Sequence, residues 1–412
     1  MFRNLCLLAA LSLSACVAVG PKYTPPDVQN LQDNYIYGNR PLYVAGKADE
    51  GPISWWQAFD DPNIDRVVAL ARENNRDLAR VAAQLEASRA AASAARRGLL
   101  PQGGVGFSIT RQEAAQAAFA GFAGGGGGGE DGGDAPPPAG DNPEFTLYQA
   151  QAQASWEVDL FGRLRRQTQA AAARQSAQAA LLADTERLVI ADAVDTYLLL
   201  LEALSRRRVA LDNLALQRRS LDLIGELFRL GEVPELDVLR QDTDVNTTAA
   251  QLTVIENAVA DAAGALAVLL GITVPQLVAT FPDILNEEAD PSLPTARGVI
   301  VLSDPASVLR RRPDVAAAER RLAAETYDIG VETAGLFPQV SLDGTASLVA
   351  LDFNGLSDPN AFGYTAGPVL SWQILSYPRI LAQRAAAKAE AKQALATFEQ
   401  TVLQALSEAD RA

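Results

Sequence analysis

The five residues GLFPQ, at 335–339, decide the fold, because GLLPQ has already appeared at 98–102. The two stretches lie 237 residues apart (335 − 98), and the match extends upstream without a gap, so that residues 76–102 align with 313–339. An internal repeat has to be recognised before any local assignment, since missing it misassigns the whole fold. The sequence therefore indicates two copies of one structural unit, each with a helix that ends at a glycine and a proline.

Downstream, the copies match again at a second spacing. Trp156 and Gln167 align with Trp372 and Gln383, 216 residues later (372 − 156). The two spacings differ by 21 residues (237 − 216), which is close to the length of a glycine- and proline-rich segment at 121–140. That segment is predicted to be a flexible loop that buries no core and is present only in the first copy. Each copy then reads as helix, strand, strand and long helix.

The first copy is predicted to occupy residues 61–270. Asp61 is a favourable N-cap residue, and Pro62 suits the first position of the helix that follows. We expect strands at about 103–112 and 145–157, and coiled-coil helices at about 164–230 and 235–270. Helices of this length exceed those of ordinary globular domains and are typical of coiled coils or helical tubes.

A tight turn separates the two long helices. It consists of Gly231, Glu232, Val233 and Pro234. Glycine suits the left-handed position just after a helix, and proline suits the start of the next one. The sequence thus predicts a helical hairpin with residues 231–234 at its tip.

Residues 271–303 contain several prolines and are predicted to be an irregular connector, after which the second copy occupies 304–412. Its strands are expected at 340–351 and 362–372. The fold class is therefore mainly α with a small β part. Four strands in one chain cannot close around a lumen, whereas a sheet that spans a membrane has to be closed. Several chains would have to associate, in a number that the residues alone do not fix.

The N-terminus resembles a lipoprotein leader. Residues 1–15 contain one basic residue and a short apolar run, and the sequence Leu-Ser-Ala precedes Cys16. This arrangement is similar to the lipobox of bacterial lipoproteins, in which the cysteine receives an S-diacylglycerol and an N-acyl chain; an ordinary secretory signal with an unrelated cysteine is the alternative. Residues 16–60 are interpreted as the lipid anchor and an extended tether. No helix beyond the leader is predicted to cross a membrane.

The composition excludes several classes of function. The formal net charge is −15, which argues against a nucleic-acid partner. Histidine is absent, so imidazole metal sites and Ser-His-Asp triads are excluded. No carboxylate spacing calls for a metal, and the glycines of 124–129 lack the Lys-Ser/Thr of a phosphate-binding loop. Catalysis, a metal and a cofactor other than the covalent lipid are therefore not expected.

Five longer stretches, taken together, resemble the TolC-type outer-membrane efflux proteins, and especially their NodT-like lipoprotein branch. They are SWWQAFDDPNIDRVV, FGRLRRQTQAAAA, LGEVPELDVLRQD, VLRRRPDVAAAERRLAAE and GLFPQVSL. The resemblance implies a homotrimer, in which four strands per protomer form a twelve-stranded barrel in the outer membrane above a long periplasmic α-barrel. It also implies a passive conduit for small molecules from a tripartite pump, with a periplasmic adaptor protein and an inner-membrane pump, expected to be of the RND type, as partners.

The resemblance also gives expectations for single residues. The turn Gly231, Glu232, Val233 and Pro234 is expected at the periplasmic tip, where adaptors engage. Four further residues are expected at junctions between strands and helices: Pro101, Gly162, Pro338 and Pro378. Pro378 replaces the glycine of the first copy, and a local change only is predicted there. The second copy ends about 74 residues short of the first (270 − 196), so a fragment is expected and no gating residue is assigned.

Two simpler readings stay open. The run Arg310 to Arg312 is more typical of a solvated or ion-paired helix face than of an anion site, and Asp242 and Asp244 either line a cation-attracting passage or face solvent. For the whole chain, the alternative to a channel is a lipid-anchored periplasmic coiled-coil scaffold without a pore. Paired strands at matched places in both copies favour the channel.

Overall fold

The computed structural model describes residues 18–26, 43–45, 54–113, 144–286, 292–296, 300–302 and 305–411. The chain divides into two compact units. The sheet unit contains Ala90–Ala172, Ala323–Gln393 and the described residues up to Thr24. The helical unit contains the described residues of Pro25–Arg89 together with Ala173–Leu322 and Ala394–Ala412.

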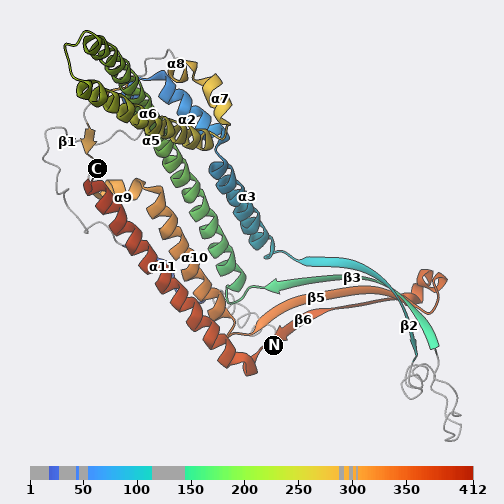
Figure 1. The fold of residues 1–412 in the computed structure, drawn as a ribbon. Coiled ribbons are helices and arrows are strands. Elements are labelled where there is room, and N and C mark those ends of the chain that lie inside the picture. Colours follow the sequence, from blue (N-terminus) through green and yellow to red (C-terminus); the bar gives the residue numbers. More distant parts are fainter. Residues whose placement is uncertain are drawn as a thin grey trace, which may run out of the picture. The chain divides into compact units, whose positions relative to one another are not determined.

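The two copies have the predicted order of elements (Figure 1). The first copy contains α2 (Pro62–Asn74), α3 (Arg76–Arg97), β2 (Gln102–Glu113), β3 (Glu144–Val158), α5 (Arg163–Arg229) and α6 (Glu235–Leu269). The second contains α9 (Pro305–Arg311), α10 (Pro313–Ala334), β5 (Gln339–Ala350), β6 (Phe362–Ser371) and α11 (Tyr377–Arg411). The mainly helical fold class with two repeats is confirmed.

Capping residues set where the first helices begin. The Asp61 carboxylate accepts a hydrogen bond from the Asn63 backbone N–H at 2.8 Å, and Pro62 follows the cap as predicted. Asn75 separates α2 from α3, and its side-chain oxygen accepts from the backbone N–H of Asp77 at 2.9 Å. These side chains satisfy backbone donors that the first turn of a helix leaves without a partner.

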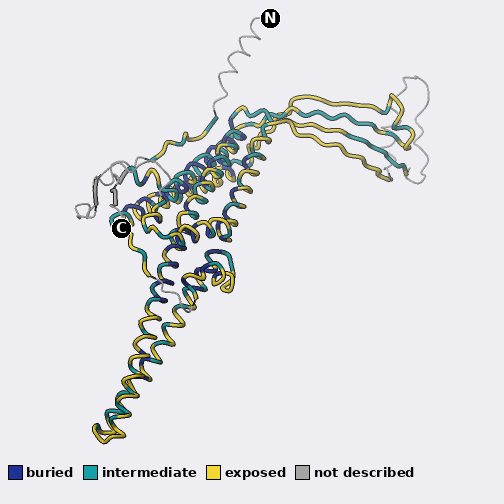
Figure 2. The backbone as a smooth tube through the Cα atoms, turned by 90° about the horizontal axis from the view of Figure 1, so that it is seen from above, coloured by how far each residue is buried: buried dark blue, intermediate teal, exposed yellow. Residues whose placement is uncertain are grey.

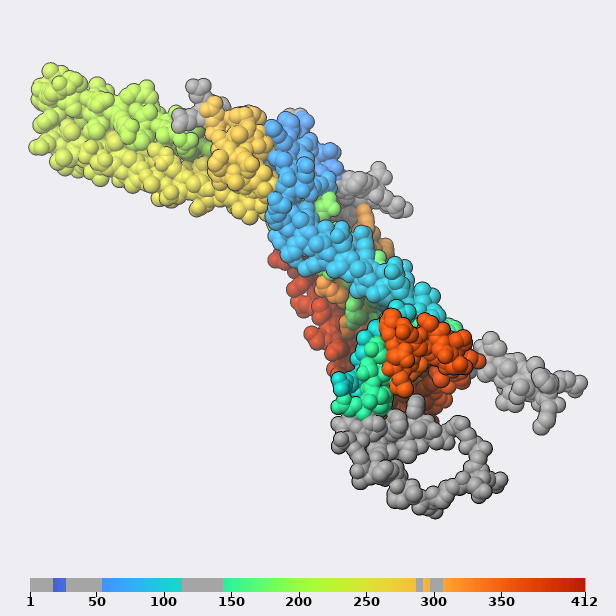
Figure 3. All heavy atoms as spheres, turned by 90° about the vertical axis from the view of Figure 1, so that its right-hand side faces the viewer, coloured from blue at the N-terminus to red at the C-terminus, as the bar shows by residue number. Residues whose placement is uncertain are grey.

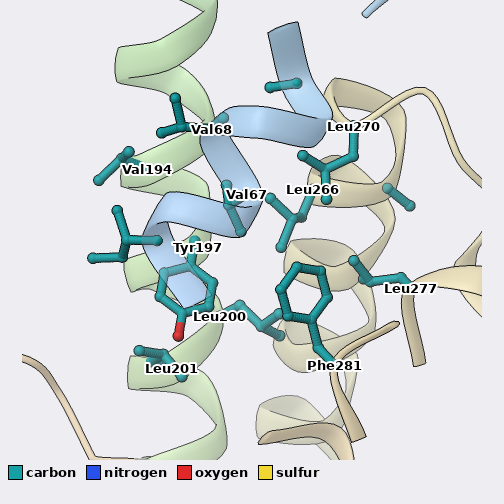
Figure 4. Packing of buried hydrophobic residues seen from close by; sticks show 14 of the residues in the cluster. Val67, Val68, Val194, Tyr197, Leu200, Leu201, Leu266, Leu270, Leu277 and Phe281 are labelled. Carbon is teal, nitrogen blue, oxygen red and sulfur yellow. The ribbon is translucent and has the colours of Figure 1, made fainter. Parts of the chain in front are cut away.

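The hydrophobic core of the helical unit lies where α2, α5 and α6 meet (Figure 4). Tyr197 and Leu200 of α5 and Leu266 of α6 are almost completely buried there. The Tyr197 hydroxyl donates to Asp61 at 3.0 Å, and burial, together with the charge of Asp61, raises the pKa of this tyrosine. The polar end of the ring is therefore satisfied inside an apolar core.

The prediction of an irregular connector at 271–303 is wrong. The segment contains α7 (Val274–Thr280), α8 (Pro282–Leu285) and β4 (Ile300–Leu302). Gln276 accepts from the Thr273 backbone N–H at 2.8 Å, which is half of a capping box. Leu277 and Phe281 are fully buried in the core of Figure 4. Their burial stabilises short helices that the density of proline had concealed.

The predicted tether at 16–60 also contains regular structure. β1 (Tyr43–Ala45) pairs in parallel with β4, and η1 (Trp55–Phe59) is a 3₁₀ helix that precedes α2. Trp56 is buried, and its indole N–H donates to Asp65 at 3.0 Å. Cys16 and the segment 121–140 lie outside the described residues.

α5 and α6 form the predicted hairpin, and they lie side by side along its length (Figure 3). The Gln241 side chain of α6 donates to the backbone oxygen of Gln217 of α5 at 3.4 Å. Exposure increases towards the turn, where Figure 2 shows mostly exposed residues on both helices. A helix pair that is so open along its far end has apolar surface left for other contacts.

The sheet unit contains four antiparallel strands in the order β2-β3-β5-β6. The central pairing joins the two copies, with Gln151 of β3 opposite Ser347 of β5. Each outer strand pairs on one side within the described residues: β2 with β3, and β6 with β5. The strands run as one curved ribbon (Figure 1).

Candidate functional site

One face of the sheet is apolar along most of its length, and the ion pair of Arg111 and Glu144 lies on it beyond Ile109 and Tyr148. Directly paired residues of an antiparallel sheet project from the same face, so the register assigns every side chain to one of two faces. The apolar face carries Val105, Phe107, Ile109, Tyr148, Ala150, Ala152, Ala154, Trp156, Leu342, Ala346, Leu348, Ala350, Phe362, Tyr364, Ala366 and Leu370. Val105 is 88% exposed and Tyr364 is 76% exposed. Such an apolar surface calls for an apolar environment.

The opposite face is polar and almost uncharged. It carries Gly104, Gly106, Ser108, Thr110, Gln149, Gln151, Gln153, Ser155, Ser341, Thr345, Ser347, Gly363, Thr365 and Gly367, with apolar Phe145, Leu147, Val349 and Val369 among them. Two carboxylates lie on this face within the described strands, Glu157 and Asp343. The weak alternation predicted along β3 becomes clear once all four strands are in register.

A row of glutamines runs along the polar face of β3. The Gln149 amide donates to Gln151 at 2.9 Å, and the Gln151 amide donates to Gln153 at 3.5 Å. Opposite them on β2 lie Gly106 and Gly104, which have no side chains, so that a groove of about 290 Å³ forms along the row. The groove offers amide donors and acceptors without a net charge.

Aromatic side chains mark both ends of the apolar face. Tyr148 contacts the Phe353 ring at one end, with ring centroids 6.2 Å apart, and Trp156 lies at the other. The eight-residue step between Tyr148 and Trp156 corresponds to about 27 Å of strand. Outer-membrane barrel strands have an apolar band of about 25 Å between aromatic girdles. At a strand tilt of about 35–45°, this length covers about 20 Å of membrane height, which is most of such a band.

The same hydrogen bond closes the strand-to-helix junction in both copies. The indole N–H of Trp156 donates to the Leu99 backbone oxygen at 2.9 Å, and that of Trp372 donates to the Leu336 backbone oxygen at 3.3 Å. Pro101 and Pro338 directly precede β2 and β5 at these junctions, as predicted. The two tryptophans align in the sequence, but no contact of either one was predicted. Their position at the repeat spacings was the available signal.

Gly162 and Pro378 lie at the other two junctions, where strands lead into α5 and α11. Gly162 adopts a φ of +79°, which is left-handed, and a Cβ atom there would lie 2.4 Å from the Cβ of Ala18. Pro378 is the second residue of α11 and follows the 3₁₀ turn η4 (Ile374–Ser376). Proline is compatible with this position, so the change is local, as expected.

Arg166, which the sequence analysis did not single out, holds the N-terminal segment against the first junction. It is 5% exposed, and its guanidinium donates to the backbone oxygens of Val19 at 3.1 Å and Gly20 at 3.3 Å. The guanidinium also lies 5.8 Å from the ring of Tyr327. The segment after Cys16 is therefore bound to the sheet unit rather than leading freely away from it.

The tip turn has the predicted backbone. Gly231 has a φ of +78°, and its N–H donates to the Phe228 oxygen at 2.9 Å. Glu232 and Pro234 are exposed, and Pro234 is the N-cap of α6. The four residues 231–234 therefore form a closed turn whose surface is available.

Of the three consecutive arginines, Arg312 takes part in a partly buried ion-pair group. It donates to Asp314 at 2.6 Å and to Glu408 of α11 at 2.7 Å. Burial alone would raise the pKa of Asp314, but the hydrogen bonds from Arg312 and the Val315 N–H, with the charges of Arg312 and Arg187, hold that pKa below its usual range. This group joins α10 to α11.

Within the described residues, no group of three or more Cys, Asp or Glu side chains is placed to hold a metal ion. One helix, α6, has the length and mean hydropathy of a membrane span, but core helices of soluble proteins pass the same test. Cys16 lies outside the described residues, and its lipidation stays a prediction.

Comparison with protein families gives a match over most of the chain. The family model for outer membrane efflux proteins matches residues 67–272 and 305–412. The pyoverdine export outer membrane protein OpmQ of Pseudomonas putida KT2440 is 31% identical and is aligned over 100% of this chain and 81% of its own length. Nodulation protein T of Rhizobium leguminosarum bv. trifolii is 27% identical, over 98% of this chain and 79% of its own length.

Solved structures give the same result. The outer-membrane channel OprN matches with a TM-score of 0.77 and 33% identity, over 95% of this chain and 81% of that one. The Campylobacter jejuni CmeC outer membrane channel has a TM-score of 0.78 at 20% identity, over 95% of this chain and 78% of that one. At that identity, the second likeness shows the fold alone.

Proposed function

The chain belongs to the outer membrane efflux protein family, as the channel component of an efflux system in the outer membrane, and from this premise we propose how it forms the conduit. Three copies associate so that β6 of each protomer pairs with β2 of the next. Twelve strands then close into one barrel. The apolar face contacts lipid and the polar face lines the lumen.

The observation that carries this proposal is the division of the sheet into two faces. A sheet whose apolar face extends about 27 Å along its strands suits a bilayer when the strands are tilted, but strands in a bilayer cannot leave edge groups without partners. Pairing of β2 with β6 of a neighbouring copy satisfies both edges. The β6 edge of each copy then meets the β2 edge of the next copy. Such a head-to-tail contact gives a closed ring if the rotation between copies closes.

We assign the partners from the same premise. The turn Gly231, Glu232, Val233 and Pro234 docks a periplasmic adaptor, and an inner-membrane pump of the RND type drives export. Small molecules pass passively, and the protein has no catalytic role. The lipid on Cys16 anchors the protomer to the outer membrane, near the sheet unit, because Val19 and Gly20 are held there by Arg166.

Neighbouring residues on opposite faces of β2 test this assignment. Phe107→Cys places a thiol on the apolar face and Ser108→Cys places one on the polar face. In washed outer membranes, a charged, water-soluble maleimide should label Ser108→Cys and spare Phe107→Cys. A lipid-soluble maleimide should label Phe107→Cys. The two variants serve as matched controls for each other.

Equal labelling of both thiols by the charged reagent would show that the sheet lies in water. The lipid-anchored scaffold without a pore would then be the better reading. Replacing residues 1–16 with a non-lipidating leader separates the two readings further. A barrel stays in the membrane through alkaline washing, whereas a scaffold is released because the lipid on Cys16 was its sole anchor.

A further inference from the structure

Asp343 is a carboxylate on the polar face whose hydrogen-bond donors, Ser155 and Ser341, are both neutral. Its side chain accepts hydrogen bonds from the hydroxyls of Ser155 on β3 and Ser341 on its own strand. The other carboxylate of this face, Glu157, accepts hydrogen bonds from two guanidinium nitrogens of Arg163, Nε and Nη2. The charge of Glu157 is therefore neutralised by an arginine, whereas Asp343 is oriented by two neutral hydroxyls.

The surroundings leave Asp343 open to the space in front of the sheet. Its cross-strand neighbour on β6 is Gly367, where an added Cβ would meet no atom within 4 Å. Its neighbour on β3 is Ser155, and the next residues along the face are Thr345 and Gln153. Each of these side chains is short or uncharged, so within the described strands no cation of this face lies next to the carboxylate.

We propose that Asp343 gives the channel a preference for cations, and so for amine-bearing, cationic small molecules over anionic ones. The inference rests on the proposed function, because it needs the polar face to line a closed lumen. Three protomers then place three Asp343 carboxylates at one height, and the rest of the wall offers neutral amides and hydroxyls. Rings of carboxylates in a pore wall attract cations and repel anions.

The expected size follows from distance and screening. Three carboxylates about 10 Å from the axis, in water at about 0.1 M salt, change the cation-to-anion permeability ratio by about two- to fivefold. At about 1 M salt the screening length falls to about 3 Å, and the effect should almost vanish. A merely structural role of Asp343 would not produce this dependence on salt.

The test is single-channel recording of the full-length protein in planar bilayers with a KCl gradient. Asp343→Asn keeps the size of the side chain and should lower the K⁺-to-Cl⁻ permeability ratio at low salt. Asp352→Asn, in the turn after β5, is the matched control and should leave the ratio unchanged. Ser347→Lys adds a positive charge to the same face, four residues along β5, and should lower the ratio with Asp343 intact.

The outcomes distinguish a failure of this inference from a failure of the proposed function. If the wild-type protein conducts and both Asp343→Asn and Ser347→Lys leave the ratio unchanged, the inference is overturned and the proposed function stands. If the wild-type protein forms no channel, the proposed function fails, and the inference fails with it. A loss of selectivity that is equal at low and high salt would also overturn the inference, since it would indicate a change in structure.

Discussion

The two junctions at which strands meet helices can be compared residue by residue at the repeat spacings. Both copies keep the bond from a tryptophan at the end of the second strand to the turn that follows α3 or α10, Trp156 to Leu99 and Trp372 to Leu336. Both also keep an arginine that reaches back to the strand end. In the first copy it contacts Glu157, and in the second it donates to the neutral Gln373 at 3.3 Å.

The junctions differ where the N-terminal segment is bound. The first copy has Gly162 and Arg166, and the second has Pro378 and an exposed Ala382 at the same positions. The glycine makes room for Ala18, and the arginine holds the carbonyls that follow it. The shared contacts therefore fix the geometry of the repeat. The residues that differ, Gly162 and Arg166, bind the N-terminal segment at the first junction.

Replacing Gly162 should lower the stability of the protein more than any other substitution at the two junctions. In Gly162→Ala, the new Cβ would collide with Ala18 and the backbone would be strained at a φ of +79°. The expected cost is about 3 kcal/mol of stability. A lower thermal unfolding midpoint and faster proteolysis of the N-terminal segment would show it. Pro378→Ala in the other copy is the control and should change stability by less than about 0.5 kcal/mol.

Arg166→Met should cause the second-largest loss of stability. The variant keeps a long apolar side chain but removes the donors to Val19 and Gly20, and we expect a loss of about 2 kcal/mol. The residue is buried and its copy-two counterpart is Ala382, so Ala382→Met is a control without expected loss. Equal protease sensitivity of the N-terminal segment in Arg166→Met and in the wild-type protein would contradict this role.

The helices α3 and α10 begin differently, and pH should reveal the difference. Asn75 caps α3, whereas Asp314, with its lowered pKa, opens α10 beside Arg312. A carboxyl whose pKa is lower in the folded state stabilises that state above its unfolded value of about 4, and the contribution is lost as pH falls through the folded value. The unfolding free energy should therefore differ most between wild type and Asp314→Asn at pH 7, by about 1.5 kcal/mol.

That difference should shrink below about pH 4, as followed by circular dichroism during urea unfolding. Asn75→Ala supplies the comparison, because an amide does not titrate and its loss should not vary with pH. A pH-independent difference for Asp314→Asn would show that the carboxylate acts only through packing.

The tryptophan pair should give the smallest effect. Trp156→Phe and Trp372→Phe each remove one indole donor, at a cost of about 1 kcal/mol or less. The loss should be larger in the first copy, because Trp156 donates at 2.9 Å to one acceptor, whereas Trp372 shares its N–H between Leu336 and the Tyr377 hydroxyl. Thermal midpoints of the two variants and of the double variant would rank them. A larger loss for Trp372→Phe would reverse the comparison.

The repeat, the long helices and the turn at Gly231 could be predicted because local chemistry fixes them. Glycine and proline end helices wherever they occur, and two copies of each signal confirm one another. The connector was missed because its prolines were read without the capping pattern of Thr273 and Gln276. That pattern was visible in the sequence.

The faces of the sheet and the role of Arg166 could not be predicted in this way. Phe145 and Leu147 place apolar side chains on the polar face of β3, so that one strand alone shows little alternation. Arg166 is one of three arginines within four residues, and its acceptors lie more than 140 residues earlier in the chain. Both features depend on pairings between distant segments, which no local pattern specifies.

The pairing of β3 with β5 also has a consequence for the order in which the chain is made. Tyr148 lies opposite Ala350, so the partner of β3 is synthesised 202 residues later (350 − 148). At about 5–20 residues per second, that delay is about 10–40 s, during which the first hairpin has an apolar face and an edge without its partner. The β2–β3 and β5–β6 hairpins each pair locally, so they can form first and join last. Until then, the early hairpin exposes an apolar face and a strand edge, both of which favour association with other chains.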